Sequence, residues 1–397
     1  MVVEWLPLAH GNAKPSLSSV LSASMTLTGI YGIFKMMSLS PQSDGVGLFL
    51  TLTGAFSVLF GALYSYVSDH VKGMLAFSTI ENNGAILAAL GSIELTNDAL
   101  LRAFAFFSLS VYVIAHSLAK TGLFLVTGYV KGESMSNLTT EKSLPLELGT
   151  VLLTASMSGL LPTIGGVAVW SLLETLFMES ISLKGVLALD PLIAGVLIGL
   201  GEGFAAGAMA RFASFTSLVR PKGTGKGRLI ALIGMLMPIL ALLSYVISPA
   251  SASIPNLGMF GRSVLVSSYS QGSFGGISPI YVLVLLIVVP SAVVLVFGKS
   301  KTRRVEPWDN GSGNKLTYTS FGIANNIRLM LRTILRTKVG DALETSADVF
   351  WIAIVSLSKI YSRFSRVFSR VYMNSSLSWY MVYMILAFII LILVVTL

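Results

Sequence analysis

The chain has 397 residues, of which 54% are apolar and only 11% charged, and its mean hydropathy is +0.80. A soluble domain is about 25% charged because it needs a hydrated surface, so this composition excludes an ordinary soluble protein and indicates a membrane protein. The chain has no cysteine, which excludes disulfides, iron–sulfur clusters and thiolate metal sites, and its three histidines are too scattered to suggest a metal site; no cofactor is expected.

Apolar segments recur along the whole chain, and a membrane-spanning helix needs about 20 mostly apolar residues. They predict an all-α membrane protein with about nine transmembrane helices, at roughly residues 16–38, 45–67, 72–92, 99–130, 147–179, 191–219, 227–248, 279–298 and 378–396. The segment 99–130 would form a helix of about 48 Å against a hydrocarbon core of about 30 Å, so it must tilt, protrude or break.

The segment 147–179 is also too long for one simple crossing, and it carries Pro162, Gly165 and Gly166 near its middle. Proline removes a backbone donor and glycine weakens a helix, so we predict a broken helix here. Such a break survives in a bilayer only where protein or a water-filled cavity satisfies the freed backbone groups. A proline kink without a functional role is the alternative interpretation.

The positive charges are distributed unevenly over the predicted loops. If loops alternate between the two sides of the membrane, one side receives 21 of the 27 Lys and Arg residues and the other receives Lys35, Arg102, Lys184 and Arg262. Cytoplasmic loops carry the basic excess, so this bias predicts a cytoplasmic N-terminus and an external C-terminus. The net charge of +9 therefore reflects topology, and no nucleic-acid partner is expected.

Two long loops differ in composition. Residues 249–278 are rich in serine and glycine and should form an external loop. Residues 299–377 form a predicted cytoplasmic segment in which four basic residues recur at helical spacing beside apolar residues: Lys359, Arg363, Arg366 and Arg370. This pattern is typical of a basic amphipathic helix, which either lies along the inner membrane surface or contacts a neighbouring subunit.

Ionisable residues inside the predicted spans are costly in hydrocarbon and therefore mark candidate functional sites. His116 and Lys120 are four residues apart, share one helix face and could form a proton relay. The other members of the set are Glu81, Glu174, Glu202 and Arg211. The last two are nine residues apart, which places them on opposite helix faces. Together these residues suggest a hydrated polar path; alternatively, they satisfy broken backbone or pair between helices.

Five motifs follow one another along the chain: EWLPLAHGNAKPSLSSVLSASMTLTGIYGIFK (4–35), SDHVKGMLAFSTIENNG (68–84), AHSLAKTGLFLVTGYV (115–130), SGLLPTIGGVAVW (158–170) and EPWDNGSGNKLTYTSFG (306–322). In this order they resemble the antiporter-like membrane subunits of complex I and energy-converting hydrogenases. The last motif is similar to the formate hydrogenlyase and membrane-bound hydrogenase branch. The resemblance implies one five-helix repeat in which Lys72, His116 and Lys120 are kept as ion-path residues.

The sequence also departs from the family pattern. The family subunits carry a further repeat before the one present here, so the resemblance implies an N-terminally shortened chain. A lysine expected in the first span is Leu27, and an acid or lysine expected at the break is Val169. The lysine expected in the sixth span is Arg211, which holds its proton too tightly to relay it.

The expected organisation has five parts. They are a remnant of the first repeat, the five-helix repeat, two further spans with the external loop, the cytoplasmic segment and a last span, at residues 1–44, 45–219, 220–298, 299–377 and 378–397. No enzyme motif is present, because KGTGKGR lacks the spacing of a phosphate-binding loop. The chain is therefore expected to be a non-catalytic subunit.

The resemblance implies a membrane-arm subunit of a proton- or sodium-translocating respiratory complex, with redox chemistry in a soluble arm. Its expected partners are other membrane subunits and lipid, and its expected location is the plasma membrane of a prokaryote. In one interpretation a companion chain supplies the missing half and this chain conducts ions; in the other it is a degenerate member that scaffolds the arm. Leu27 and Val169 favour scaffolding, because a hydrophobic side chain blocks proton transfer unless water replaces it. A free-standing secondary transporter is a third alternative, which a single repeat disfavours.

Overall fold

The computed structural model describes residues 5–135, 139–140, 143–216, 226–244, 268–269, 272–273, 279–298, 324, 326–327, 329–330, 349–372 and 377–396. They belong to two compact units, Met1–Asn326 and Ile327–Leu397. The described residues are mostly helical, as the composition predicts, and their β-structure consists of two antiparallel pairs of two-residue strands. These are β1 (Val130–Lys131) with β2 (Thr139–Thr140), and β3 (Ser268–Tyr269) with β4 (Gly272–Ser273).

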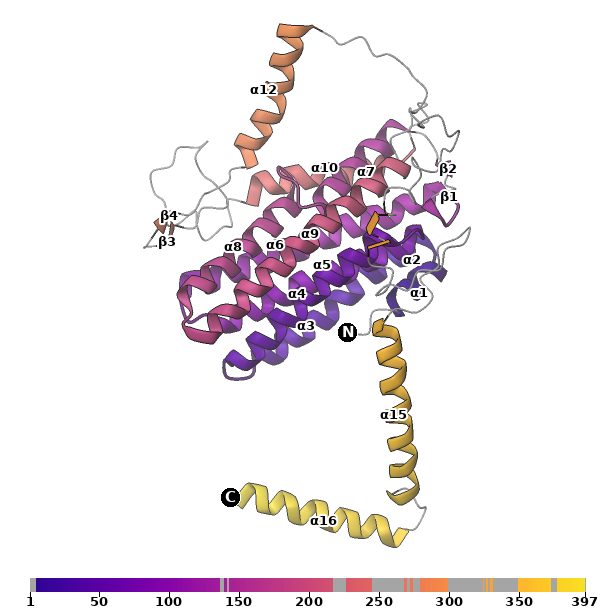
Figure 1. The fold of residues 1–397 in the computed structure, drawn as a ribbon, viewed down its shortest axis with the longest axis vertical. Helices are drawn as coiled ribbons and strands as arrows, with labels where there is room; N and C mark the ends of the chain where they lie inside the picture. Colours follow the sequence, from indigo (N-terminus) through magenta and orange to yellow (C-terminus); the bar gives the residue numbers. More distant parts are fainter. Residues whose placement is uncertain are drawn as a thin grey trace. The chain divides into compact units, whose positions relative to one another are not determined.

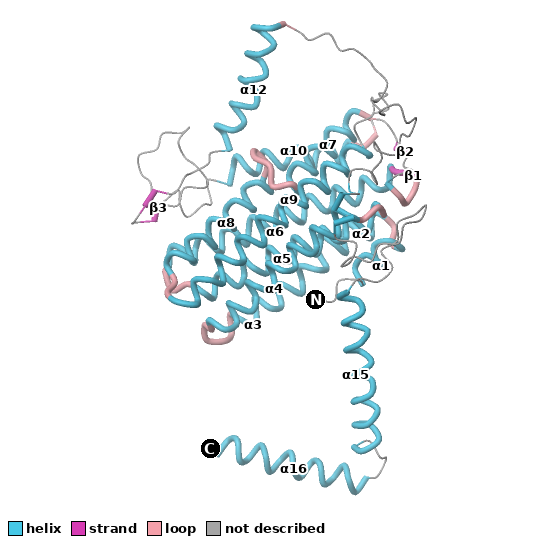
Figure 2. The backbone as a smooth tube through the Cα atoms, in the orientation of Figure 1, coloured by secondary structure: helices cyan, strands magenta, loops and turns pink. Residues whose placement is uncertain are grey.

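The first unit contains a bundle of helices (Figures 1 and 2). Its elements are α1 (Trp5–Asn12), α2 (Pro15–Val20), a π-helical turn (Leu21–Met25), α3 (Thr26–Met37), α4 (Asp44–Val67), α5 (Val71–Leu95), α6 (Ala99–Val126), a 3-10 turn (Thr127–Tyr129), α7 (Leu144–Met157), α8 (Ile164–Ser182), a second 3-10 turn (Gly185–Ala188), α9 (Leu189–Thr216), α10 (Arg228–Leu243) and α12 (Pro279–Phe297). Helix α4 packs against α5 and α9, and α6 packs against α5 and α8.

Small residues let α4 and α5 approach each other closely. A Cβ atom added at Gly54 would lie 2.5 Å from the carbonyl oxygen of Gly84, and one added at Gly84 would lie 2.6 Å from that of Gly54. Membrane helices pack by such close backbone contact because hydrocarbon supplies no hydrophobic force between them. The α4–α5 pair therefore forms a rigid support for the polar side chains that α5 carries.

Six described segments are long and apolar enough to cross a bilayer: Pro15–Met37, Asp44–Val67, Leu101–Tyr129, Ile164–Ser182, Gly185–Ser214 and Pro279–Val296. Shorter apolar stretches lie in α7, in α10 and at Leu377–Ile390 of α16 (Leu377–Thr396), and α5 is a long, largely buried helix rich in polar residues. Each of the nine predicted spans therefore falls on a helix, but only six of the described segments are long and apolar enough to cross a bilayer. Of the three alternatives for segment 99–130, a break is not found, because α6 runs unbroken to Val126 and only the turn after it tightens into a 3-10 helix.

The second unit contains α15 (Val349–Tyr372) and α16 (Leu377–Thr396). Helix α15 includes the four basic residues at helical spacing and confirms that this sequence is helical. Most of segment 299–348, including the motif at 306–322, lies outside the described residues, as does most of the Ser/Gly-rich loop 249–278. The predicted boundaries of the five parts of the chain, and the side of the membrane on which each loop lies, stay predictions.

Candidate functional site

The segment 147–179 is broken, as predicted, and the break separates α7 from α8. Gly159 has a left-handed backbone with φ of 64°, and Pro162 lies in the non-helical stretch that follows. Gly165 and Gly166, which we expected within the break, instead form the first turn of α8. Their role is close packing: the Gly165 N–H donates to Ser156 Oγ at 3.1 Å, and a Cβ at Gly165 would lie 1.8 Å from the Ser156 carbonyl oxygen.

His116 and Lys120 lie one turn apart on α6, and both are completely buried. The Lys120 ammonium donates hydrogen bonds to the hydroxyl of Ser78 and, at 3.1 Å, to the carbonyl of Leu75, both on α5. His116 Nε2 lies 3.2 Å from the carbonyl oxygen of Ser22 in the π-helical turn. The two side chains thus share a helix face, as predicted, but direct their hydrogen bonds to different elements.

Two buried carboxylates, Glu81 and Glu202, extend the cluster of polar side chains beyond Lys120. Glu81 lies on α5 three residues after Ser78 and is within electrostatic reach of both Lys120 and Glu202. Glu202, on α9, accepts a hydrogen bond of 2.8 Å from the hydroxyl of Tyr112. The oxygens Glu81 Oε2 and Glu202 Oε2 have no hydrogen-bond partner among the described residues. We name His116, Lys120, Ser78, Glu81, Glu202 and Tyr112 the buried polar line.

The buried polar line reaches the broken helix at Glu202. A Cβ atom placed on Gly159 would lie 3.1 Å from Val169 Cγ2 and 3.6 Å from Glu202 Oε2. Val169 and the carboxylate of Glu202 therefore both border the same glycine at the break. The position at which the family pattern expects a charge holds valine, but α9 brings a carboxylate to that place.

Arg211 does not join the buried polar line. It donates hydrogen bonds to the carbonyls of Tyr66 and Ser68, where α4 ends, and its Nη2 lies 3.8 Å from Asp69 Oδ1. The guanidinium also lies 5.7 Å from the centre of the Tyr66 ring. As predicted, Arg211 and Glu202 do not pair. Arg211 instead fixes the turn between α4 and α5.

The remaining sequence-predicted residues lie away from the centre of the buried polar line. Lys72 is half-buried at the start of α5 and donates a hydrogen bond of 2.7 Å to the carbonyl of Ala13. Glu174 is half-buried on α8 and accepts a hydrogen bond of 3.1 Å from Nε1 of the exposed Trp170. Lys72 therefore marks the rim of the bundle, whereas Glu174 faces its outer side.

The sequence interpretation missed several buried polar groups. Tyr112 was not singled out because tyrosine is common in apolar helices. Glu179 is fully buried on α8 and accepts a hydrogen bond of 2.9 Å from Ser92 on α5. Asp190, also buried, acts electrostatically on Glu179. Glu179 and Asp190 could have been identified from the sequence, since each lies in or beside a predicted span, where a carboxylate is costly.

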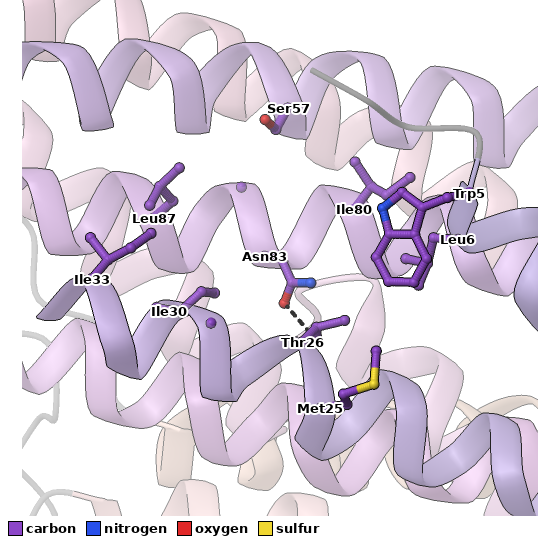
Figure 3. A pocket seen from close by; sticks show the side chains of 12 residues that line it. Trp5, Leu6, Met25, Thr26, Ile30, Ile33, Ser57, Ile80, Asn83 and Leu87 are labelled. Carbon is purple, nitrogen blue, oxygen red and sulfur yellow. Dashed lines mark hydrogen bonds between the residues drawn. The ribbon is translucent and has the colours of Figure 1, made fainter. Parts of the chain in front are cut away.

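A separate apolar pocket of about 480 Å³ lies between α1, α3, α4 and α5 (Figure 3). Its one internal polar contact is a hydrogen bond of 3.5 Å from Thr26 Oγ1 to Asn83 Oδ1, and aliphatic side chains such as Ile30, Ile33 and Leu87 form most of the wall. Such a surface suits lipid or another membrane helix. Within the described residues, no group of three His, Cys, Asp or Glu side chains is arranged to hold a metal ion.

Comparison with known families shows what the first half of this helix bundle is similar to. Residues 1–189 match the family described as NADH:quinone oxidoreductase/Mrp antiporter, transmembrane. The chain is a membrane protein of antiporter-like fold. The match covers α1 to α8 and so includes the broken helix, Lys120 and Glu81. The match includes the first four of the five motifs and confirms the resemblance to antiporter-like subunits for this part of the chain.

Relatives of the antiporter-like chain extend this match. Hydrogenase-4 component B of Escherichia coli is 26% identical over 371 residues, which cover 84% of this chain and 55% of that protein. The Na(+)/H(+) antiporter subunit A1 of Staphylococcus aureus is 30% identical over 188 residues, covering 44% of this chain and 23% of that subunit. The chain spans between 20% and 55% of the length of the curated relatives it matches.

A solved structure shares the fold of the antiporter-like chain. A chain in the membrane-bound sulfane sulfur reductase, an archaeal respiratory membrane complex, aligns over 98% of this chain and 65% of its own length with a TM-score of 0.64. The sequence identity is 18%, so the likeness concerns the fold alone. The protein is therefore a multi-pass membrane protein with the antiporter-like arrangement of helices.

Proposed function

We propose that this chain is a membrane subunit of a proton- or sodium-translocating respiratory complex, and that the buried polar line carries the ion through it. The observation that carries the proposal is the contact of Lys120 with Ser78 and Leu75, within electrostatic reach of Glu81, in a fully buried core. A lysine in a dry core is costly and is retained where its charge is used.

The chemistry of the buried polar line fits ion transfer. One ammonium and two carboxylates interact within it, and both carboxylates keep an oxygen without a partner among the described residues. Such an oxygen costs about 1–3 kcal/mol in a dry site, so a proton, a sodium ion or water there would be stabilising. Because Glu202 borders the break beside Val169, the missing charge at position 169 argues less strongly against conduction than the sequence alone suggested.

Scaffolding without conduction is the second candidate function, and Leu27 favours it. Leu27 packs against the apolar core, and its span offers the buried polar line the backbone carbonyl of Ser22 but no charged group among the described contacts. In this reading the chain would hold neighbouring membrane subunits in place. In both readings redox catalysis belongs to partner subunits and not to this chain.

The discriminating experiment is Lys120→Met in the assembled complex. Methionine keeps the approximate volume of lysine but removes the titrating group. In reconstituted vesicles, conduction predicts that the number of ions moved per electron transferred falls in Lys120→Met. Lys184→Met is the matched control, because it removes a lysine that is exposed. An unchanged ratio in a fully assembled Lys120→Met complex would rule out conduction through Lys120 and leave scaffolding.

We also propose that the chain contacts other membrane subunits. Helix α3 has no buried residue, so its surface is available for lipid, other membrane subunits or a companion chain. The chain should therefore co-purify with other membrane proteins in mild detergent, and a monodisperse folded monomer would argue against the subunit role.

The predicted orientation can be tested by single-thiol labelling in intact cells, because the chain has no cysteine. Ser40→Cys should label from outside and Lys131→Cys from the cytoplasm; the reverse would contradict the predicted orientation.

A further inference from the structure

His10, on the short helix α1, is a fully buried histidine that the buried polar line does not include. Its ring stacks on Phe124 with 4.4 Å between ring centres and 17° between ring planes. Neither Nδ1 nor Nε2 has a hydrogen-bond partner among the described residues. A histidine that only filled space would leave two polar atoms buried at a cost of about 1–3 kcal/mol each, which an apolar side chain of similar shape would avoid.

The stack places His10 at one end of the buried polar line. His116, Lys120 and Phe124 are spaced four residues apart on α6 and so share one face. His116 lies one turn before Lys120, and His10 covers the residue one turn after it. Lys120 is therefore flanked along α6 by two buried imidazoles, one carried on the helix and one supplied by α1.

On its other side, α1 adjoins the rim of the bundle. Lys72 donates to the carbonyl of Ala13, three residues after His10, and holds this end of α1 against α5. A hollow of about 130 Å³ lies at this point, and its wall includes Gly11, His70, Lys72 and Glu133. The hollow thus begins at the residue that follows His10 in the chain.

The charge around His10 keeps its ring neutral. Burial, followed by the positive charges of Lys120 and Lys72, lowers the pKa of His10 to about 4. A neutral imidazole has one donor and one acceptor nitrogen, so it can take a proton on one side while releasing one on the other. The positive charges of Lys120 and Lys72 destabilise the protonated, cationic ring between these steps.

We propose that His10 is a relay residue that connects the hollow at Lys72 with Lys120, through water bound at its two ring nitrogens. This inference rests on the proposed function, because a relay has a purpose only if Lys120 exchanges ions. It adds a defined route from the rim of the bundle to the buried polar line and assigns a residue on α1 to it.

The first test measures whether water reaches position 10. His10→Cys introduces a single thiol into a chain without cysteine, and Leu123→Cys is the matched control because Leu123 is equally buried, on α6 beside Phe124. In the assembled complex, a small polar methanethiosulfonate should react with the thiol at position 10 at least ten times faster than with the thiol at position 123. Equal rates would overturn the inference.

The second test separates a relay from a structural role. His10→Phe keeps the stack on Phe124 but removes both nitrogens, and His10→Gln keeps hydrogen bonding but cannot pass a proton. In fully assembled complexes both variants should lower the rate of ion translocation at least tenfold. Wild-type translocation in either variant would overturn the relay. If only the His10 variants translocate normally while Lys120→Met does not, this inference fails and the proposed function stands; normal translocation in Lys120→Met would overturn both.

Discussion

The hydroxyl of Tyr112 donates a hydrogen bond of 2.8 Å to Glu202 and so ties α6 to α9 beside the broken helix. Glu202 is buried, and its second oxygen borders Gly159 at the break. Tyr112 therefore determines which way the carboxylate can turn. This gives the tyrosine a positioning role in the buried polar line.

Replacing Tyr112 by phenylalanine should test that role. Tyr112→Phe removes the hydroxyl that donates to Glu202 and leaves that buried carboxylate oxygen without its hydrogen bond. The free energy of unfolding should therefore fall by about 1–3 kcal/mol. Ion translocation by the assembled complex should fall as well. Thermal unfolding in detergent measures the first effect, and Tyr31→Phe is the control because the Tyr31 ring is exposed. Equal unfolding temperatures for the two variants would contradict the prediction.

Arg211 should matter for stability more than for ion transfer. Arg211→Met removes the donor to the carbonyls of Tyr66 and Ser68 and the cation beside Asp69, and losing one partner of a buried pair costs about 3–5 kcal/mol. Arg211→Lys should lose less stability than Arg211→Met but still be less stable than the wild type, because an ammonium cannot reproduce the forked hydrogen bonds of a guanidinium. A double-mutant cycle with Asp69→Asn measures the coupling. Full recovery by lysine would mean that charge alone suffices there.

The first turn of α8 should not tolerate a side chain at Gly165. The Cβ of Gly165→Ala would lie 1.8 Å from the Ser156 carbonyl oxygen, so α7 and α8 would have to separate and assembly should fail or unfolding should become several kcal/mol easier. Gly199→Ala on α9 is the control, since nothing lies within 4 Å of its Cβ. It should stabilise the helix by up to about 1 kcal/mol. Equal yields of both variants would argue against the tight α7–α8 contact.

His10 should make the protein acid-sensitive. Its pKa is about 4 in the folded protein and 6.5 in the unfolded chain, so the unfolded state takes up the proton first as pH falls. The contribution of the neutral ring to the free energy of unfolding is therefore fully present above pH 6.5. It decreases as the pH falls from 6.5 to 4, by on the order of 3 kcal/mol in total. His10→Phe lacks this loss. The difference in unfolding temperature between the two proteins should therefore shift in favour of the variant from pH 7.5 to pH 5; a constant difference would contradict the assigned pKa.

Much of the architecture was predictable from the sequence. Long apolar segments interrupted by short polar loops predict membrane helices, because a bilayer requires about 20 apolar residues for each crossing. Pro162 predicts the break, since proline cannot continue the hydrogen bonding of a helix. The spacing of His116 and Lys120 places them on one face of α6. Each of these is a local property of the chain, and the structure bears each one out.

Only the tertiary structure decided which polar residues meet. Glu202 and Arg211 lie on the same helix, yet one faces Tyr112 and the break whereas the other holds the α4–α5 turn. Glu81 reaches Lys120 because the glycines of α4 and α5 bring their backbones together and fix the rotation of α5. Periodicity assigns a residue to a helix face, but it does not say which helix lies opposite that face. That choice depends on packing between segments far apart in the chain, and it is why His10 becomes a neighbour of Phe124 and of the Lys120 face only in the folded protein.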